Sequence, residues 1–274
     1  MYRLIQLENW WGHRKRLFWI ADHIKDNSVC LDVGCGTGAY LTIPLNLLMQ
    51  ERGIKSKIYG MDLAKESIEV AKKNAKIMNL PSDIFFCGDI TKHENKYDIV
   101  ICSEVLEHIS DIYLDEFVDG LCEKVSEDGT LIITVPNGNG SFEKGKRMRK
   151  SFFGKTLFVA IEKIATIFNY VFLHKFMYFD MSNLKTKEDK ILAEMTVSMT
   201  EHVQFFCKND IVKLFEKRDM KLVEFSGAAR FSGAWICLLP PFQFITQINN
   251  NLVDKEPLNA SGYYFVFKKE KNEC

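Results

Sequence analysis

The sequence predicts an α/β fold built on a doubly wound, mostly parallel sheet. Apolar runs of strand length alternate with helical patterns between residues 28 and 136. The first run, Val29–Val33, leads into three closely spaced glycines, which is typical of a buried strand that turns sharply into a helix. With 274 residues, 47% of them hydrophobic and 26% charged, the chain is long and apolar enough for one sizeable core.

The elements of this sheet can be predicted in chain order. Strands are expected where β-branched and aromatic residues gather between turn signals, and helices where apolar residues recur every three to four positions. The predicted strands are Val29–Val33, Lys57–Met61, Ile84–Cys87, Ile99–Ser103, Thr130–Val135, Lys221–Phe225 and Tyr263–Phe267. Helices are predicted after the glycines and at Lys65–Met78, Leu114–Val125 and Lys208–Arg218.

The composition argues against several classes of protein. Lys and Arg together number 36, as do Asp and Glu, so the chain lacks the overall positive field of many nucleic-acid-binding proteins. None of the eight cysteines forms a C-x-x-C pair, and several lie in apolar runs, which favours reduced thiols over a metal site or a disulfide framework. We therefore expect a cytoplasmic protein that holds no metal and binds no nucleic acid.

A carboxylate lies just ahead of the glycines. Asp32 is followed by Gly34, Gly36 and Gly38, which let a ligand approach the backbone at a helix N-terminus. A carboxylate here would repel a pyrophosphate but attract an ammonium group, so the loop suits a nucleoside that carries an amino acid, such as S-adenosylmethionine. Because Gly34, Gly36 and Ala39 also fit the G-x-G-x-x-A dinucleotide fingerprint, a nicotinamide-dependent oxidoreductase remains an alternative.

Two later strands also end in carboxylates. Asp62 closes the second strand, where an acidic side chain can accept both hydroxyls of a ribose; the alternative is an N-cap for the next helix. Asp89 follows the third strand and is placed to reach an adenine amino group, with Ile90 against the ring. Gly-Asp is also common in ordinary turns, which is the alternative for Asp89.

Five motifs in this order resemble those of one family. They are Leu31–Gly38, Asp62, Gly88–Ile90, Tyr97–Val100 and Glu104–His108. The chain resembles the class I S-adenosylmethionine-dependent methyltransferases, in the small-molecule branch that includes the ubiquinone-biosynthesis type. The likeness covers residues 28–137 strongly and 202–268 loosely. It implies a seven-stranded, Rossmann-like methyltransferase fold with its last strand inserted antiparallel, and S-adenosylmethionine as the cofactor. To this fold the residues of the long interruption described below would add a helical cap insertion.

The resemblance also implies a set of donor-binding residues. Asp32 would organise the amino group of the donor, and Ser103 and Glu104 would line the floor beneath the sulfonium. Arg14 would pair with the donor carboxylate, although its segment is equally explained as an amphipathic helix packed on the core. The implied cofactor-binding residues are Arg14, Asp32, Gly34, Cys35, Gly36, Gly38, Asp62, Leu63, Asp89, Ile90 and Ser103.

Three side chains, Glu104, His108 and His202, are candidates for the catalytic base. An oxygen acceptor usually has to lose a proton, and a base should titrate near the working pH. His108 lies four residues after Glu104, on the same face if that segment is helical; a role in positioning the loop is the alternative. His202 follows a long interruption of the pattern and could lie over the methyl group, the alternative being a structural histidine at a turn.

The interruption, residues 138–201, offers the clues to the acceptor. A basic run from Lys144 to Lys150 precedes an apolar-rich stretch with helical spacing, whose internal charges argue against a membrane-spanning helix. Two interpretations remain, a substrate cap and an interfacial helix that brings residues 144–179 into peripheral contact with a membrane. We expect four parts: a helical lid at 1–27, the cofactor-binding core at 28–137, this insertion, and the rest of the core sheet at 202–274.

The sequence therefore predicts transfer of a methyl group from S-adenosylmethionine to an oxygen of a small-molecule or lipid-linked acceptor. A non-catalytic protein that binds S-adenosylmethionine is the main rival, followed by the oxidoreductase. Leu239–Phe242 resembles the Pro-Pro-aromatic motif of amino-group nucleic-acid methyltransferases. It lies far from the fourth strand and lacks the preceding Asn or Asp, so it does not change this prediction.

Overall fold

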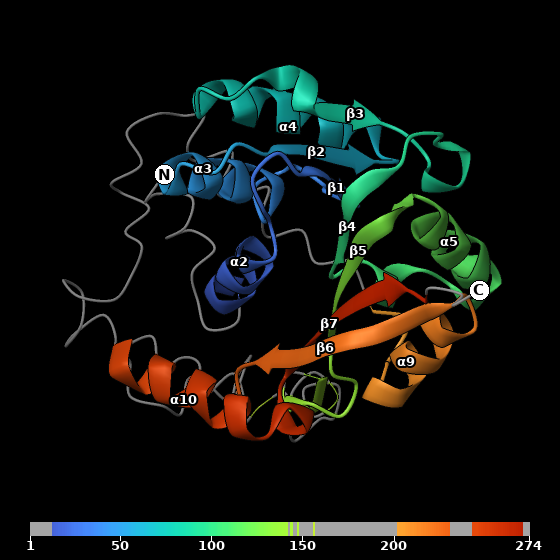
Figure 1. The fold of residues 1–274 in the computed structure, drawn as a ribbon. Coiled ribbons are helices and arrows are strands. Elements are labelled where there is room, and N and C mark those ends of the chain that lie inside the picture. Colours follow the sequence, from blue (N-terminus) through green and yellow to red (C-terminus); the bar gives the residue numbers. More distant parts are fainter. Residues whose placement is uncertain are drawn as a thin grey trace.

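The computed structural model describes residues 13–141, 202–230 and 243–270, together with Glu143, Lys144, Arg147 and Thr156. The described strands form one seven-stranded sheet in the order β3-β2-β1-β4-β5-β7-β6 (Figure 1). Neighbours from β3 to β5 are parallel, and β7 is antiparallel to both β5 and β6. The strands are β1 (Val29–Val33), β2 (Lys57–Asp62), β3 (Phe85–Cys87), β4 (Tyr97–Ser103), β5 (Val125–Pro136), β6 (Met220–Ala228) and β7 (Gly262–Lys269). The predicted doubly wound sheet with an antiparallel last strand is confirmed.

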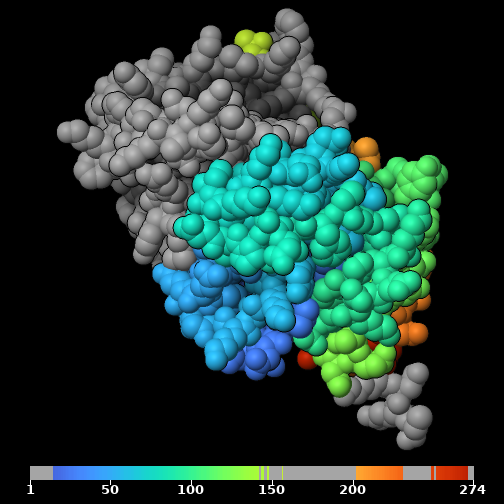
Figure 2. All heavy atoms as spheres, turned by 90° about the horizontal axis from the view of Figure 1, so that it is seen from above, coloured from blue at the N-terminus to red at the C-terminus, as the bar shows by residue number. Residues whose placement is uncertain are grey.

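Helices cover both faces of the sheet, because successive strand side chains point to opposite sides. Cys30 packs with α2 and α3 on one face, whereas Leu31 packs with α5 and α9 on the other (Figure 1). α4 forms the outer layer seen from above in Figure 2, and its Ile68 packs near Phe85. The helices are α2 (His13–Asp22), α3 (Thr42–Arg52), α4 (Lys65–Ile77), α5 (Asp111–Glu123), α9 (Lys208–Glu216) and α10 (Gln243–Lys255).

The register of the central strands places the predicted site residues at one edge. Val33 at the end of β1 is paired with Met61 of β2 and with Cys102 of β4. The next residues along these strands therefore leave the sheet side by side, at the carboxyl ends where open α/β sheets bind ligands.

The boundary between α5 and β5 differs from the prediction. Leu114–Val125 was predicted as a helix, but α5 ends at Glu123 and Val125 opens β5. Val125 is fully buried and pairs with Tyr97 of β4. Pairing with a neighbouring strand thus ends the helix, and helical periodicity alone carries no information about that partner.

The helix α10 was not predicted. Its apolar pattern is interrupted by Asn249–Asn251, and asparagine is a modest helix former. In the structure Val253 is fully buried in the main core cluster, and the carbonyl of Asn249 accepts a hydrogen bond from the backbone N–H of Arg230. Tertiary packing therefore outweighs the weak local signal.

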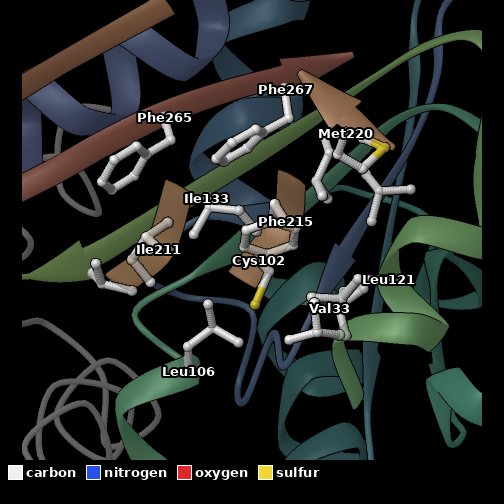
Figure 3. Packing of buried hydrophobic residues seen from close by; sticks show 14 of the residues in the cluster. Val33, Cys102, Leu106, Leu121, Ile133, Ile211, Phe215, Met220, Phe265 and Phe267 are labelled. Carbon is white, nitrogen blue, oxygen red and sulfur yellow. The ribbon is translucent and has the colours of Figure 1, made fainter. Parts of the chain in front are cut away.

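The loop after β4 is anchored in the core by Leu106. This residue lies in a short 3₁₀ turn, Leu106–His108, and its side chain is fully buried. Figure 3 shows the side chain pointing into the cluster around Cys102, Ile211 and Phe215. The loop that carries Glu104 and His108 is thus fixed by packing on two layers of the fold.

Most of the predicted insertion lies outside the described residues, so the cap and the interfacial helix both stay predictions. Within the part of the chain that the structure describes, no helix combines the length and apolar character needed to cross a membrane. The described cysteines Cys30, Cys35, Cys87, Cys102, Cys122 and Cys207 are free thiols, as the sequence predicted.

We expect Leu106→Ala to lower the free energy of unfolding by about 2–5 kcal/mol, because it removes a fully buried side chain and leaves a cavity. The control is Ile112→Ala on α5, where the side chain is 79% exposed and the change should stay within about 0.5 kcal/mol. Urea unfolding followed by circular dichroism measures both. Equal effects for the two variants would show that Leu106 does not anchor the loop.

Candidate functional site

The three glycines of the loop after β1 have different roles. All have positive φ angles, +75° at Gly34, +54° at Gly36 and +71° at Gly38. A Cβ at Gly34 would lie 2.6 Å from Cγ2 of Val105, and one at Gly38 would meet the ring of Phe85. A Cβ at Gly36 would meet nothing within 4 Å. Packing therefore requires glycine at the outer two positions, whereas Gly36 borders open space.

Asp62 is joined to the glycine loop. Its Oδ2 accepts a hydrogen bond of 2.8 Å from the backbone N–H of Gly36, and its Oδ1 accepts one of 2.8 Å from the N–H of Ala64. The second bond is the local turn expected from the N-cap alternative, although Ala64 itself is the N-cap residue of α4. Leu63 beside it is 69% exposed. The carboxylate thus lies against the loop at Gly36, with lone pairs left to accept further hydrogen bonds.

Asp32 is buried beneath the loop. It is 3% exposed, and its Oδ2 accepts a hydrogen bond of 2.6 Å from the hydroxyl of Thr42 at the start of α3. Burial raises the pKa of Asp32 to about 7, with the negative charge of Asp62 acting in the same direction. The Thr42 hydroxyl and the positive charge of Arg16 act in the opposite direction. Asp32 is therefore poised to change its charge near neutral pH.

Cys35 lies in the same loop but is part of the core. Its side chain is buried with Ala39 and Ile43, and burial raises the pKa of its thiol far above the ordinary value. The thiol is thus a small hydrophobic group rather than a nucleophile. Its predicted contact with the cofactor stays a prediction.

The end of β4 is held by a chain of hydroxyl and carboxylate groups. The Ser103 and Thr134 hydroxyls are 2.8 Å apart, and the Thr134 hydroxyl donates to Oε1 of Glu104 at 3.0 Å. Glu104 has a φ of +57°, a left-handed conformation that is unfavourable for a residue with a side chain. Its backbone N–H donates to the carbonyl of Thr134 at 2.9 Å, which fixes this conformation.

The structure places Arg16 beside Glu104 at the end of β4. Its side chain is 5% exposed, and its guanidinium lies 3.4 Å from Oε1 of Glu104. Arg14 is also in α2, but its side chain lies outside the described residues, so its predicted role is untested. Spacing could have indicated Arg16, because it precedes the buried Ile20 of α2 by one helical turn.

Asp89 and Ile90 are integrated into the fold. Asp89 accepts hydrogen bonds from the backbone N–H and the hydroxyl of Thr91, at 3.0 and 2.9 Å, which is the turn that the alternative expected. The side chain of Ile90 is buried, and it lies close to Gly120 of α5. Their predicted contacts with adenine are compatible with this arrangement and stay predictions.

A second cluster forms where the chain returns from the insertion. The backbone N–H groups of Val203 and Gln204 donate to the carbonyl of Glu107 at 2.8 and 3.1 Å. This bridge brings the rings of His108 and His202 together, with centroids 5.0 Å apart and planes at 75°. The two predicted histidines are thus neighbours, although 93 residues of sequence separate them.

Two glutamates in this cluster were not predicted as site residues. Glu143 accepts a hydrogen bond from Nδ1 of His202 at 2.7 Å and is 1% exposed. Glu107 is 2% exposed, and in the described part of the chain its Oε2 has no hydrogen-bond partner. Burial, and after it the negative charge of Glu104, raises the pKa of Glu107 well above the ordinary value.

The predicted pairing of Glu104 and His108 on one helical face is not formed. Only Leu106–His108 is helical, as a 3₁₀ turn, and Glu104 lies ahead of it and turns toward Thr134 and Arg16. His108 instead has Glu107 beside it, with Nε2 and Oε1 3.9 Å apart. The Glu-His dipeptide was the available signal, because Glu107 is adjacent to a predicted site residue.

Comparisons with known proteins match this architecture. Residues 11–224 match the model of a family described as a methyltransferase domain. The ubiquinone biosynthesis O-methyltransferase of Pelagibacter ubique is 31% identical over 118 residues, which are 43% of this chain and 45% of that protein. The ribosomal protein L11 methyltransferase of Campylobacter lari is 28% identical over 127 residues, 45% of this chain and 41% of that protein. The matches thus span less than half the length of these two relatives.

A solved structure shows the same fold. Magnesium protoporphyrin IX methyltransferase from Synechocystis PCC 6803, crystallised with bound SAH, superposes with a TM-score of 0.50 at 17% identity and covers 94% of this chain and 82% of that one. Since the family model spans well over half of the sequence, the chain belongs to the methyltransferase-domain family, and its predicted membership of the class I S-adenosylmethionine-dependent methyltransferases is confirmed.

Proposed function

We propose that this chain transfers a methyl group from S-adenosylmethionine to an oxygen atom of a small-molecule or lipid-linked acceptor. The observation that carries the proposal is a pair of carboxylates at the glycine loop: Asp62 accepts a hydrogen bond from the backbone N–H of Gly36, and Asp32 is buried beneath the loop. Two acidic groups at a glycine loop repel a pyrophosphate but suit a donor with an ammonium group and ribose hydroxyls. This favours S-adenosylmethionine over a nicotinamide dinucleotide.

The residues around the glycine loop fit this donor. The ionised carboxylate of Asp32 would bind its ammonium group, and the remaining lone pairs of Asp62 would accept the ribose hydroxyls. Ser103 and Glu104, fixed by Thr134, would form the adjoining wall. When bound, S-adenosylmethionine supplies a methyl group on a positively charged sulfonium, so the protein has chiefly to align the acceptor and exclude water.

An oxygen acceptor agrees with the histidine cluster. A hydroxyl group becomes a better nucleophile as it loses its proton, and imidazole is the side chain that most often accepts one near neutral pH. The hydrogen bond to Glu143 holds the ring of His202 in one orientation. His108 and His202 are therefore the side chains proposed to accept the proton of the acceptor hydroxyl.

The acceptor itself is proposed from the sequence features of the insertion. The two curated relatives are named for different acceptors, yet both match only about half of this chain. The basic and apolar run at 144–179 supports a small or lipid-linked acceptor, with peripheral contact with a membrane.

Gly36→Val is expected to weaken binding of S-adenosylhomocysteine by about 100-fold or more, because the side chain enters the space that the donor needs. Gly53→Val is the matched control. Gly53 also has a positive φ, +71°, and open space around its Cβ, but it lies at the far end of α3. Calorimetric titration of both folded variants gives the comparison, and equal affinities would contradict the placement of the donor at Gly36.

Donor affinity is expected to rise roughly tenfold between about pH 6 and pH 8, because Asp32 ionises across this range and only the carboxylate attracts the ammonium group. Asp32→Asn keeps the hydrogen bond from Thr42 but removes the charge, so its affinity should be lower and nearly independent of pH. Titrations at several pH values test this. The same pH slope in both proteins would exclude Asp32 as the titrating group.

The proposed function is tested in two steps. We expect micromolar binding of S-adenosylmethionine and S-adenosylhomocysteine and no binding of NADH. A nicotinamide-dependent oxidoreductase would instead bind NADH and neither of the sulfur nucleosides. Formation of S-adenosylhomocysteine is then measured with a panel of phenols, amines and thiols, with and without liposomes. Transfer to hydroxylated compounds is expected; donor binding without transfer to any of them would favour the non-catalytic alternative.

A further inference from the structure

We propose that Thr134 is a positioning residue that makes the site prefer the charged methyl donor over its neutral product. It acts through two neighbours at the end of β4, Ser103 and Glu104. Thr134 is itself fully buried, so it does not touch a ligand. The inference deepens the proposed function and rests on it, because it takes the donor to lie against the loop at Gly36.

The three residues lie next to the glycine loop. Ser103 is the last residue of β4, and it is paired directly with Thr134 of β5. Glu104 follows Ser103, and the next side chain, Val105, packs tightly on the glycine loop: a Cβ at Gly34 would lie 2.6 Å from Cγ2 of Val105. The backbone around Glu104 is therefore held beside the loop at which the donor is proposed to bind.

The hydrogen bonds of Thr134 fix the direction of two protons. Its hydroxyl donates to Oε1 of Glu104 at 3.0 Å, since a carboxylate can only accept. A hydroxyl has a single proton, so in the contact of 2.8 Å between the two hydroxyls Ser103 must be the donor. The proton of Ser103 is thus directed to Thr134, and its oxygen has only lone pairs to offer to a ligand.

The carboxylate of Glu104 is anchored through one of its oxygens. The hydroxyl of Thr134 and the guanidinium of Arg16, which is 3.4 Å away, both lie at Oε1. The backbone N–H of Glu104 donates to the carbonyl of Thr134 at 2.9 Å, which holds its left-handed conformation. Because the side chain is 31% exposed, the carboxylate reaches the accessible surface in an orientation that Thr134 sets through both backbone and side chain.

Ser103 and Glu104 together present an electron-rich surface. Held in this way, both side chains offer lone pairs and neither offers a proton. Such a surface attracts the positive sulfonium of S-adenosylmethionine. The thioether sulfur of S-adenosylhomocysteine is neutral and carries lone pairs of its own, so it gains nothing from this surface. We therefore expect the donor to bind more tightly than the product.

This preference would favour release of the product. The sulfonium loses its charge when the methyl group leaves, and its attraction to Glu104 ends with it. Specificity is a difference between two affinities, and it is lost when a site can adapt to both ligands. A serine whose hydroxyl could rotate would offer a proton to the thioether and a lone pair to the sulfonium. The hydrogen bond to Thr134 removes this freedom from Ser103.

The test compares Thr134→Val with Thr134→Ser. Valine has nearly the shape of threonine and keeps the backbone carbonyl that holds Glu104, but it lacks the hydroxyl, which serine retains. Calorimetric titration gives the ratio of the Kd of S-adenosylhomocysteine to that of S-adenosylmethionine. We expect this ratio to exceed one in the unaltered chain, to fall about tenfold in Thr134→Val, and to be largely restored in Thr134→Ser. Thr130→Val, on the same strand, is the matched control and should leave the ratio unchanged.

A double-mutant cycle tests whether Thr134 acts through Glu104. Glu104→Gln removes the charge, so it should lower the ratio by itself, and Thr134→Val should change little more in that background. Glu104→Gln alters a partly exposed side chain, so it tests the proposal even if Thr134→Val does not fold. An analogue with an ammonium group in place of the sulfonium methyl should follow S-adenosylmethionine in every variant.

The ratio separates positioning from a merely structural role, which would weaken both nucleosides equally. A ratio of one or less in the unaltered chain, or one that neither Thr134→Val nor Glu104→Gln lowers, would overturn the proposal. Independent effects of the two substitutions in the cycle would also overturn it. If the unaltered chain binds neither nucleoside, the methyltransferase function fails as well, so the two failures are distinguishable.

Discussion

The parallel pairing of β1 with β2 and β4 is the constraint on which the site depends. In such a sheet every strand ends at the same edge, and each backbone hydrogen-bonding group is already used within the ladder. The chain must therefore turn away at that edge, and the turning residues are free to meet a ligand. Asp32 near the end of β1, Asp62 at the end of β2 and Glu104 just after β4 are brought together in this way. Their proximity is a property of the sheet and of none of the three segments alone.

Buried charge is the cost of this arrangement, and hydroxyl groups offset part of it. Thr42 donates to Asp32 and Thr134 donates to Glu104, so each carboxylate has a fixed polar partner in a region of low polarity. Arg16 adds one positive charge beneath them. Such a network holds acidic groups in one orientation, as a site for a positively charged ligand requires, although it contributes little to stability.

The chemistry divides into two regions that join at the loop after β4. The proposed donor side consists of the glycine loop and the strand ends. The proposed acceptor side consists of Glu107, His108 and the returning segment with His202, which backbone hydrogen bonds and a ring contact hold together. Leu106, buried between them, fixes the spacing of the two regions.

The sequence by itself determined the strands of the sheet and the donor motifs. Periodicity, glycine spacing and strand-end carboxylates are local signals, so Asp32, Gly36 and Asp62 could be predicted as a group. Only the tertiary structure decided that Arg16 is buried beside Glu104, that Glu104 turns away from His108, and that Glu107 and Glu143 join the two histidines. These contacts link residues far apart in the chain, and the free energy of burying their charges together depends on a geometry that no local pattern encodes.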